Sequence, residues 1–207
     1  MEYTELLSTF ITSLGSVIVA LVAAGYFRKS HESKKISISR EKLMAQIKKD
    51  EIVHYAIRDL RRKYNADRIY IWQFHNGGNF YTNSPMQRTS ISYERCSEGL
   101  ERKTEKYQNL LVSNFSGYFI NIINEEMFYS DIHDMTDIGI KSLAQSNGTK
   151  SHCSAPIYDS KNMLIGVLSL DWVFSEIPSS LIDDSGDFTE EMIFDFVKES
   201  QSISSYL

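Results

Sequence analysis

Residues 152–174, HCSAPIYDSKNMLIGVLSLDWVF, decide the fold of this chain. Two apolar runs, 155–158 and 163–172, flank the turn-forming residues Asp159-Ser160-Lys161-Asn162, a pattern that predicts a β-hairpin. Both alternating sets of the second run are apolar: Met163, Ile165 and Val167 on one side, and Leu164, Leu168 and Leu170 on the other. A strand with two apolar faces is buried on both, so the rest of the chain must supply two covering layers.

Three positions in this segment carry specific expectations. Gly166 stands where a strand side chain is expected, which indicates a β-bulge or the close approach of another backbone. His152 and Cys153 are adjacent, so on a strand their side chains point to opposite faces and cannot bind one metal ion together. We therefore expect a structural role for each of them.

The composition is that of one globular domain with accessory segments. The chain has 207 residues, of which 42% are apolar and 24% charged, and its two cysteines, Cys96 and Cys153, are too few for a disulfide framework. The formal charge of −5 is unevenly distributed: residues 1–27 carry −2, residues 28–49 carry +6 and residues 50–207 carry −9. Phosphate binding needs a basic surface, so the acidic main part argues against a nucleic-acid partner.

Residues 6–27, LLSTFITSLGSVIVALVAAGYF, form an uncharged span of 22 residues. At about 1.5 Å per residue this length crosses a hydrocarbon core of about 30 Å, so we predict one transmembrane helix, with a buried core helix as the alternative. A cleaved signal peptide would need basic residues before the span, whereas Glu2 and Glu5 precede it and Arg28 and Lys29 follow it. The positive-inside rule then places residues 1–5 outside and the main domain in the cytoplasm, as in a single-pass protein of the inner (cytoplasmic) membrane.

Two features of residues 6–49 favour contacts with a second copy of the chain and with lipids. A stripe of small side chains recurs every fourth residue and favours close helix pairing and a homodimer. Its members are Ser8, Thr12, Ser16, Ala20 and Ala24. Residues 28–49, which include Arg28 and Lys29, are predicted to form a basic juxtamembrane helix or linker held to anionic lipids of the bilayer, with a freely solvated linker as the alternative.

The main domain, residues 50–204, is predicted to begin with a helix and two antiparallel strands. The helix, residues 50–65, has an apolar face through Val53, Ile57, Leu60 and Tyr64 and stops at Asn65. The next segment alternates Ile69 and Ile71 with Tyr70, Trp72 and Phe74, which predicts a strand with an aliphatic and an aromatic face. Asn76-Gly77-Gly78 is expected to turn the chain, and residues 89–95 to return beside the first strand.

Shorter elements are expected before and after the hairpin. Residues 98–106 are highly charged and expected to be exposed, and residues 116–127 have a helical apolar face through Phe119, Ile122 and Ile123. A helix capped at Thr136 is expected to run to Gln145 and to end at Asn147-Gly148. A last helix is expected to open at Asp187, with Ile193, Phe196, Val197, Ser200 and Ile203 on its apolar face.

The order of these elements and one sequence pattern resemble the GAF domain, a small-molecule-sensing fold related to PAS domains. The pattern is Ser151-x-x-x-x-Pro156-Ile157-x-Asp159-x-x-x-x-Leu164-Ile165-Gly166-Val167-Leu168-x-Leu170-Asp171. The resemblance implies an α+β fold: a GAF/PAS-like antiparallel sheet with the terminal helices on one face and a ligand pocket, or its closed remnant, on the other. Terminal helices in this family often pair two subunits, which again implies a homodimer.

The chain departs from several ligand-binding branches of that family. It lacks the Asn-Lys-Phe-Asp-Glu type of signature that marks members binding cyclic nucleotides. Bilin-binding relatives attach their chromophore through a pocket cysteine that is often followed by histidine, whereas the order here is His152-Cys153. Members that reduce methionine sulfoxide use several pocket cysteines, and this chain has two. No cofactor is therefore expected.

The aromatic face of the first strand is the best candidate for a ligand site. Pockets combine apolar walls with a few polar groups, and polar residues follow the aromatic ones here. The candidate ligand-binding residues are Tyr70, Trp72, Phe74, His75, Asn76 and Tyr81. An ordinary aromatic core is the alternative, because aromatic side chains dominate many protein interiors.

Motifs for catalysis or metal binding give no further candidate. Asp131, His133, Asp134 and Asp137 are metal-binding residue types, but acidic residues before a helix are expected as caps, so no metal site is predicted. There is no G-x-S-x-G, Walker A or H-E-x-x-H motif, so no catalytic residue is predicted.

Three functional hypotheses follow. The leading one is a membrane-tethered GAF-like sensory or regulatory binding module that is not an enzyme. The second is a structural or assembly protein whose GAF-like fold mediates protein contacts at the membrane. An open cavity lined by Trp72 and His75 would favour the first, and a filled one the second. The third is a small redox enzyme using Cys96 or Cys153, which would need a cationic setting that stabilises a thiolate.

Overall fold

The computed structural model describes residues 39–79, 83, 85–125 and 127–207. The predicted span at residues 6–27, the basic residues 28–38 and Tyr81 lie outside this part of the chain. No helix within the described ranges has the length and apolar character needed to cross a bilayer. The chain divides into two units, Met1–Met44 and Ala45–Leu207, and the second contains the sheet.

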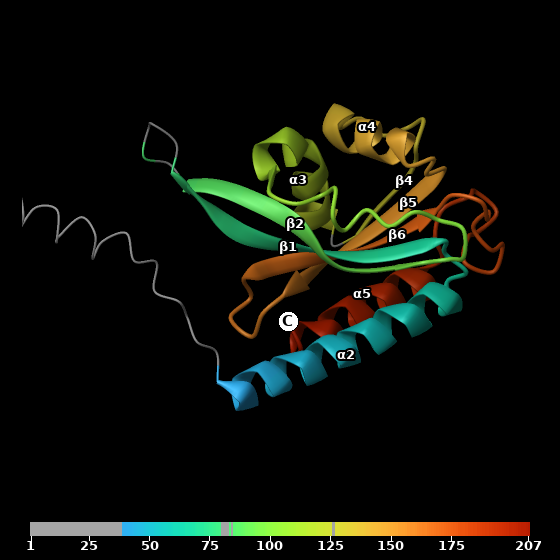
Figure 1. The fold of residues 1–207 in the computed structure, drawn as a ribbon. Helices are drawn as coiled ribbons and strands as arrows, with labels where there is room; N and C mark the ends of the chain where they lie inside the picture. The colour runs from blue at the N-terminus through green and yellow to red at the C-terminus, as the bar shows by residue number, and fades with distance from the viewer. Residues whose placement is uncertain (1–38, 80–82, 84, 126) are drawn as a thin grey trace, which may run out of the picture. The chain divides into compact units, whose positions relative to one another are not determined.

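The described part of the second unit is built on one antiparallel sheet with the strand order β3-β2-β1-β6-β5-β4. The strands are β1 (Arg68–Asn79), β2 (Pro85–Cys96), β3 (Leu110–Leu111), β4 (Phe128–Asp131), β5 (Ser151–Tyr158) and β6 (Leu164–Trp172). α5 (Glu190–Ser204) and the part of α2 (Arg40–Lys63) that follows Met44 cover one face (Figure 1). α3 (Ser116–Glu125), preceded by the 3-10 turn Val112–Phe115, and α4 (Ile138–Ser146) cover the other (Figure 1). The predicted antiparallel sheet with terminal helices on one face is confirmed.

The predicted hairpin is confirmed as β5 and β6. Its turn is held by the Asp159 side chain, whose Oδ1 accepts hydrogen bonds from the backbone N–H groups of Lys161 and Met163 at 2.9 and 2.8 Å. Gly166 fulfils both expectations for it, because a Cβ there would lie 2.5 Å from the Trp72 carbonyl oxygen and because the β5–β6 register shifts beside it. The shift leaves Ile165 unpaired opposite β5.

This bulge corrects one detail of the predicted strand. Ile165 was expected on the same face as Val167, but it packs on the α2–α5 side, whereas Val167 lies on the α3–α4 side. An extra residue in one strand interrupts the alternation of side chains, so the prediction from strict alternation is wrong at this position.

The antiparallel pairing of the first two strands is confirmed, but the turn between them is not where it was predicted. β1 continues through Asn76, Gly77 and Gly78 to Asn79, with an irregular register between Asn76 and Asn79. The two glycines make this possible: Gly78 has a φ of +96°, and a Cβ on Gly77 would lie 2.6 Å from the Arg88 side chain on β2. The two glycines therefore make the pairing of β1 with β2 irregular at this point, and they do not form the predicted turn.

Three helix ends differ from the predictions, because other side chains supply the capping contacts. α2 runs without a break past residue 50 and is followed by Asn65, whose φ of +47° stops it as predicted. α4 is capped by Asp137, whose carboxylate accepts the Ile140 N–H at 3.0 Å, and not by Thr136. α5 is capped by Thr189, which accepts the Met192 N–H at 3.3 Å, and not opened by Asp187.

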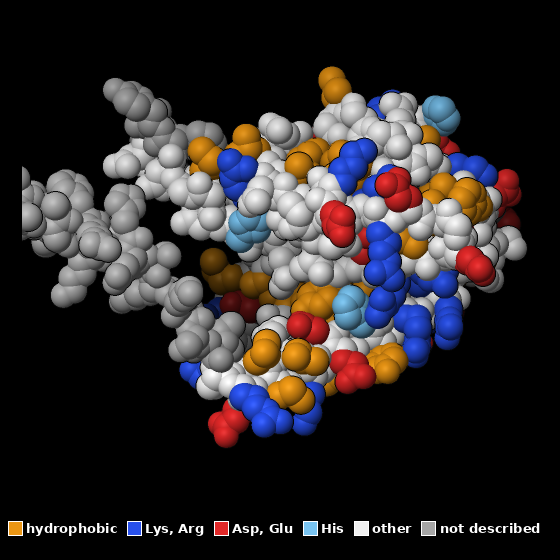
Figure 2. Space-filling model, in the orientation of Figure 1, with side chains coloured by type: hydrophobic (Ala, Val, Ile, Leu, Met, Phe, Trp, Pro, Cys, Tyr) orange, Lys and Arg blue, Asp and Glu red, His pale blue; other side chains and the backbone are white. Residues whose placement is uncertain are grey.

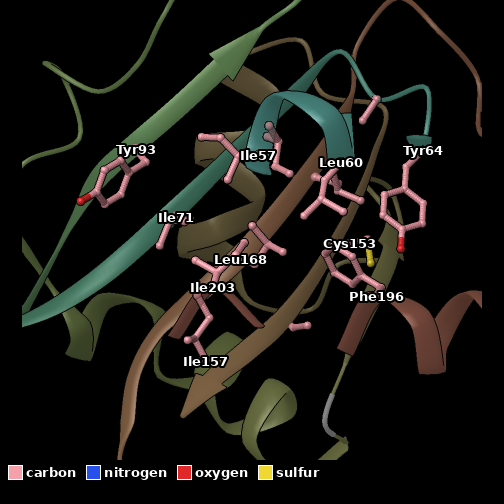
Figure 3. Packing of buried hydrophobic residues seen from close by; sticks show 14 of the residues in the cluster. Ile57, Leu60, Tyr64, Ile71, Tyr93, Cys153, Ile157, Leu168, Phe196 and Ile203 are labelled. Atoms are coloured by element: carbon pink, nitrogen blue, oxygen red, sulfur yellow. The ribbon is translucent and has the colours of Figure 1, made fainter. Parts of the chain in front are cut away.

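The layer between the sheet and helices α2 and α5 is an apolar core. Figure 3 shows Ile57 and Leu60 of α2, Tyr64 directly after it, and Phe196 and Ile203 of α5 against residues of the sheet. The sheet contributes Ile69, Ile71, Tyr93, Cys153, Ala155, Ile157, Leu168, Leu170 and Trp172 to this core. Leu168 and Leu170 are fully buried in it, so the central hairpin carries the core as expected.

Candidate functional site

The opposite face of the sheet carries the predicted aromatic side chains. Tyr70 and Trp72 are buried there, 6% and 3% exposed, beneath α3 and α4. The ring of Trp72 lies nearly parallel to that of Tyr107 at 6.3 Å between centroids, and Phe74 contacts the edge of Phe119 at 5.1 Å. The structure therefore brings three of the predicted ligand-lining residues onto one face.

The polar members of the predicted set, His75 and Asn76, line an open surface groove with Phe74 but do not join Tyr70 and Trp72. His75 belongs to the alternate set of β1, and its Nε2 lies 2.9 Å from Ser90 Oγ, on the other side of the strand pair from Phe74. The side chain of Asn76 accepts a hydrogen bond from the Gly78 N–H at 2.9 Å and so bonds locally. The expected placement of His75 assumed that the strand ended there, but β1 continues, so alternation turns His75 away from Trp72.

A different set of polar side chains lies beside Tyr70 and Trp72, and we call it the buried polar cluster. Its members sit at alternate positions on β1, β2, β5 and β6 or reach in from α3, and each is at most 3% exposed. They are Arg68, Glu94, Tyr118, His152, Ser154, Ser169 and Asp171. Because charged residues are rarely buried this completely without partners, their contacts explain how they are tolerated.

Asp171 is the centre of the buried polar cluster. Its Oδ2 accepts hydrogen bonds from Arg68 Nη1 at 2.9 Å and Thr149 Oγ1 at 3.3 Å. Its Oδ1 lies 2.8 Å from His152 Nδ1 and accepts from Tyr70 Oη at 3.2 Å. A carboxylate offers about four acceptor positions, so the acceptor capacity of Asp171 is fully used.

The cluster extends in two directions from Asp171. His152 Nε2 lies 2.8 Å from Ser154 Oγ and 3.0 Å from Tyr118 Oη, and Ser154 Oγ lies 2.7 Å from Ser169 Oγ. On the other side, Arg68 Nε lies 3.3 Å from Glu94 Oε1 without making a hydrogen bond. Glu94 also accepts the backbone N–H groups of Lys103 and Thr104 at 2.8 and 2.9 Å, so this buried carboxylate fixes the segment that follows β2.

The surroundings fix the charge states in this network. Burial raises the pKa of the Asp171 carboxyl, but the hydrogen bond from His152 and the charge of Arg68 outweigh it and hold that pKa below its usual value. Burial raises the pKa of Tyr70 and of Tyr118 above that of an exposed tyrosine. Asp171 is thus an anion at neutral pH, and because an anion only accepts, His152 donates to it through Nδ1.

The distances among Ser154, His152 and Asp171 match those of a nucleophile with its base and orienting carboxylate. Ser154 is nevertheless fully buried and does not line the nearby cavity. Its Oγ also contacts Tyr118 Oη at 2.6 Å, which closes the approach a substrate would need. The three residues therefore act as a hydrogen-bonded network and give no candidate nucleophile in this conformation.

A small cavity of about 10 Å³ lies against the buried polar cluster. Its floor is formed by residues of the sheet, and its roof by α4 and the segment after β2. The lining residues are Arg68, Tyr70, Trp72, Ile91, Lys103, Tyr107, Ile140, Leu143, Ala144, Asn147, His152 and Asp171. This volume is at the lower limit of what one water molecule occupies, so side chains fill most of the space.

Contacts between the two parts of the roof close this cavity. Tyr107 Oη donates to Asn147 Oδ1 at 2.9 Å, which ties the segment after β2 to the end of α4. Lys103 is buried even though residues 98–106 were expected to be exposed, because Glu94 binds the backbone N–H groups of this segment from below. Within α4 only Ile140 and Ala144 are buried, so the helix rests on a small contact area.

The acidic residues and the two cysteines noted in the sequence are placed for structural roles in the fold. The described residues contain no group of three or more His, Cys, Asp or Glu side chains placed to hold a metal ion. Asp137 caps α4 and Asp131 Oδ1 accepts the His133 N–H at 2.8 Å. Burial raises the pKa of Cys153 well above its usual value, and burial together with the Glu94 carboxylate raises the pKa of Cys96 to about 11. Neither cysteine has the thiolate-stabilising setting that the redox hypothesis requires.

The charged residues of the cluster were not predicted from the sequence, and neither were Tyr118, Ser154 and Ser169. Arg68, Glu94 and Asp171 were not among the candidates, although Asp171 follows the apolar run of β6 and Arg68 opens β1. A charged residue on a strand predicted to be buried on both faces needs a buried partner, and that signal could have identified them. His152 was expected to point away from Cys153, and it does: His152 is in the cluster and Cys153 in the apolar core.

Comparison with known proteins gives the same architecture. No family model matches the chain, and no curated protein matches it. Among solved structures, the blue-light-absorbing form of the Thermosynechococcus elongatus PixJ GAF domain is similar, with a TM-score of 0.58 and 15% identity over 79% of this chain and 86% of that one. The phycocyanobilin-bound GAF domain from a cyanobacterial phytochrome has a TM-score of 0.55 and 16% identity, over 83% of this chain and 97% of that one.

A third similar structure is the GAF domain region of a protein from Geobacter sulfurreducens PCA, with a TM-score of 0.51 and 13% identity over 80% of this chain and 97% of that one. At such identities the likeness concerns the fold alone. The described main part of this chain therefore has the fold of GAF domains.

Proposed function

We propose that this chain is a membrane-tethered sensory or regulatory module, without catalytic output, that binds a small molecule between the sheet and the roof formed by α4 and the segment after β2. The observation that carries the proposal is the buried polar cluster against a cavity. Burying an ion costs several kcal/mol, and apolar residues of similar volume would stabilise a core at least as well. Polar groups kept at this place are therefore better explained by ligand recognition than by stability.

A movement of α4 would couple ligand binding to a change at the protein surface. Ligand entry would displace α4, which rests on Ile140 and Ala144, and would change the contact between Tyr107 and Asn147. A movement of α4 alters the molecular surface on the α3–α4 side, where Ile138 is 80% exposed. A protein partner that binds this surface would distinguish the ligand-bound from the ligand-free state.

One of the similar structures is a phycocyanobilin-bound GAF domain, which supports small-molecule binding by this fold without naming a ligand for this chain. Bilin attachment is not part of our proposal, because no cysteine lines the cavity and Cys153 faces the opposite core.

A thermal-shift screen of small metabolites on the full-length protein in detergent tests the proposal. A ligand at 100 times its dissociation constant should add about 2.7 kcal/mol to the free energy of unfolding. Ala144→Leu places a larger side chain in the cavity and should abolish this stabilisation, whereas Ile138→Ala on the exposed side of α4 should retain it. A screen without any stabilising compound, or a compound that stabilises Ala144→Leu equally, would refute the proposed site.

The second candidate function is assembly, and two observations favour it. The cavity is nearly filled, at about 10 Å³, and α2 exposes a run of large apolar side chains (Figure 2). In the second unit these side chains are Ile47, Ile52 and Tyr55, each 43–50% exposed. If assembly is the function, Ile52→Glu should dissociate a homodimer measured by native mass spectrometry, and the metabolite screen should remain blank.

The membrane tether is a separate part of the proposal and rests on the sequence of residues 6–27. Full-length protein should remain in the membrane fraction after carbonate extraction, and a variant lacking residues 1–27 should be released. Protease added to intact cells should spare the main domain if residues 28–49 lie in the cytoplasm. Recovery of the full-length chain in the soluble fraction without detergent would contradict the tether.

A further inference from the structure

The polar atoms around the cavity are not balanced between donors and acceptors. Among the described residues, four buried side-chain nitrogens lack a hydrogen-bond partner: His54 Nδ1, Arg68 Nε, Trp72 Nε1 and Trp172 Nε1. Two of these, on Arg68 and Trp72, belong to residues that line the same cavity. Arg68 Nε lies 3.3 Å from the Glu94 carboxylate, which balances its charge, so the Trp72 N–H is the cavity donor that has lost water without gaining an acceptor.

The remaining polar groups of the cavity do not correct the imbalance. The Asp171 carboxylate already accepts from Arg68, Thr149 and Tyr70 and pairs with His152. Lys103 adds another donor, and its Nζ lies 2.6 Å from the carboxylate of Glu101, whose side chain is 81% exposed. An ion pair with an exposed partner contributes little, so Lys103 can exchange that partner at small cost. The cavity therefore offers the unpartnered Trp72 N–H and the Lys103 ammonium, whereas the Asp171 carboxylate has no acceptor position left.

One wall of the cavity has the opposite character. It is formed by the apolar side chains of Ile140, Leu143 and Ala144 of α4 and Ile91 of β2, together with the ring of Tyr107. A molecule that fits both sides needs an acceptor group at one end and an apolar body at the other.

Building on the function proposed above, we propose that the cavity binds small monocarboxylates. The carboxylate accepts a hydrogen bond from Trp72 Nε1, with Lys103 as a nearby counter-charge, and the apolar body packs against α4. Hydrogen bonds to a charged acceptor are stronger than those to a neutral one, so an acid is favoured over its amide. An amine is disfavoured because it would bring further donors and a positive charge to Arg68 and Lys103.

Butyrate and 3-phenylpropionate, each with its amide and its amine counterpart, are suitable probes. The chain has two tryptophans, so in full-length Trp172→Phe the fluorescence comes from Trp72 alone. We expect at least one acid to change this emission in a saturable way, with an affinity at least tenfold higher than that of its amide, and no binding of the amines. Ala144→Leu should abolish the response.

Trp72→Phe tests the donor directly, because it removes the N–H and keeps an aromatic ring. Its affinity for the acid, measured by calorimetry, should fall about tenfold or more, as expected for a lost hydrogen bond to a charged group. Trp172→Phe is the matched control: the same change removes an equally unpartnered N–H, but Trp172 lies in the apolar core on the opposite face. Its affinity for the acid should equal that of the unmodified protein.

The outcomes separate this proposal from the function on which it depends. If neither acid binds, or if an amide or amine binds as tightly as its acid, the proposed ligand class is wrong, while another stabilising compound sensitive to Ala144→Leu would preserve the sensory function. If an acid binds equally to Ala144→Leu or to Trp72→Phe, the cavity is not its site. A blank metabolite screen together with no acid binding would refute both.

Discussion

The two faces of the sheet use the same strands for different purposes. On β6, Leu168, Leu170 and Trp172 enter the apolar core under α2 and α5, whereas Ser169 and Asp171 enter the buried polar cluster under α3 and α4. The first face is held by non-directional packing, and the second by hydrogen bonds between groups that must each find a partner. Side chains one position apart should therefore respond differently to substitution.

The largest effect is expected on the polar face. Asp171→Asn keeps the size of the side chain but removes the anion that Arg68 and His152 share, which leaves a buried guanidinium without its main partner. Breaking a buried ion pair in this way should lower the free energy of unfolding by about 3–5 kcal/mol in denaturant titrations. Asp184→Asn, at an exposed loop position, is the control and should change stability by less than about 0.5 kcal/mol. Equal stability of the two variants would show that the polar cluster is not a structural unit.

A comparable or somewhat smaller loss is expected from the apolar face. Leu168 is fully buried in the core under α2 and α5, so Leu168→Ala should cost about 2–5 kcal/mol through lost burial and the cavity left behind. Met163→Ala, in the hairpin turn where Met163 is 62% exposed, should have little effect. The two substitutions should differ clearly in thermal melting. An unchanged melting curve for Leu168→Ala would contradict the placement of the core.

Removing the contact between α3 and the buried polar cluster should lower the free energy of unfolding by a smaller amount. Tyr118→Phe removes the hydroxyl that contacts Ser154 Oγ at 2.6 Å and His152 Nε2 at 3.0 Å and leaves the ring in place. We expect a loss of about 1–3 kcal/mol, the range for a buried polar group left without its partner. Tyr55→Phe on the exposed surface of α2 is the matched control and should be nearly neutral. If Tyr118→Phe were equally neutral in denaturant titrations, the contact of α3 with the cluster would not contribute to stability.

The apolar face was predictable from the sequence and the polar face only in part. The periodic positions Val53, Ile57 and Leu60 and the alternate positions Leu168 and Leu170 of β6 are local patterns, and all of them enter the expected core. The aromatic side of β1 followed from alternation in the same way. The arrangement of Arg68, Glu94 and Asp171 depends on the register of β1 against both β2 and β6, which no local pattern specifies.

The misplaced details have a common physical origin. The expected positions of His75, Ile165 and the first turn all assumed regular alternation or a regular hairpin, and each lies beside a glycine. At Gly166 the missing side chain lets the Trp72 carbonyl approach, and at Gly77 it makes room for Arg88. A glycine in a strand signals that the backbone departs from regularity, but the direction of the departure depends on the neighbouring strand.

The smallest effect concerns Asp67, which belongs to neither face and closes the end of the sheet. Its Oδ2 accepts three consecutive backbone N–H groups, from Val173, Phe174 and Ser175, at 2.7–2.8 Å. Burial raises the pKa of Asp67, but these hydrogen bonds, led by that from Ser175, hold it below the usual value. The stabilisation by the carboxylate is therefore complete above the unfolded-state pKa of about 3.9 and is lost as pH falls through the lower folded-state pKa.

Asp67→Asn should remove this pH-dependent contribution, because an amide does not titrate in that range. We expect it to lower the free energy of unfolding by about 1 kcal/mol at neutral pH, where the charged acceptor is lost. The difference from the unmodified protein should shrink below about pH 4, as the Asp67 carboxyl of the unmodified protein takes up its proton. Asp184→Asn, at an exposed loop position, changes the net charge equally and controls for overall electrostatics. Denaturant titrations from pH 7 to pH 3 provide the measurement, and a constant difference across this range would mean that the Asp67 carboxylate does not hold the end of β6 through its charge.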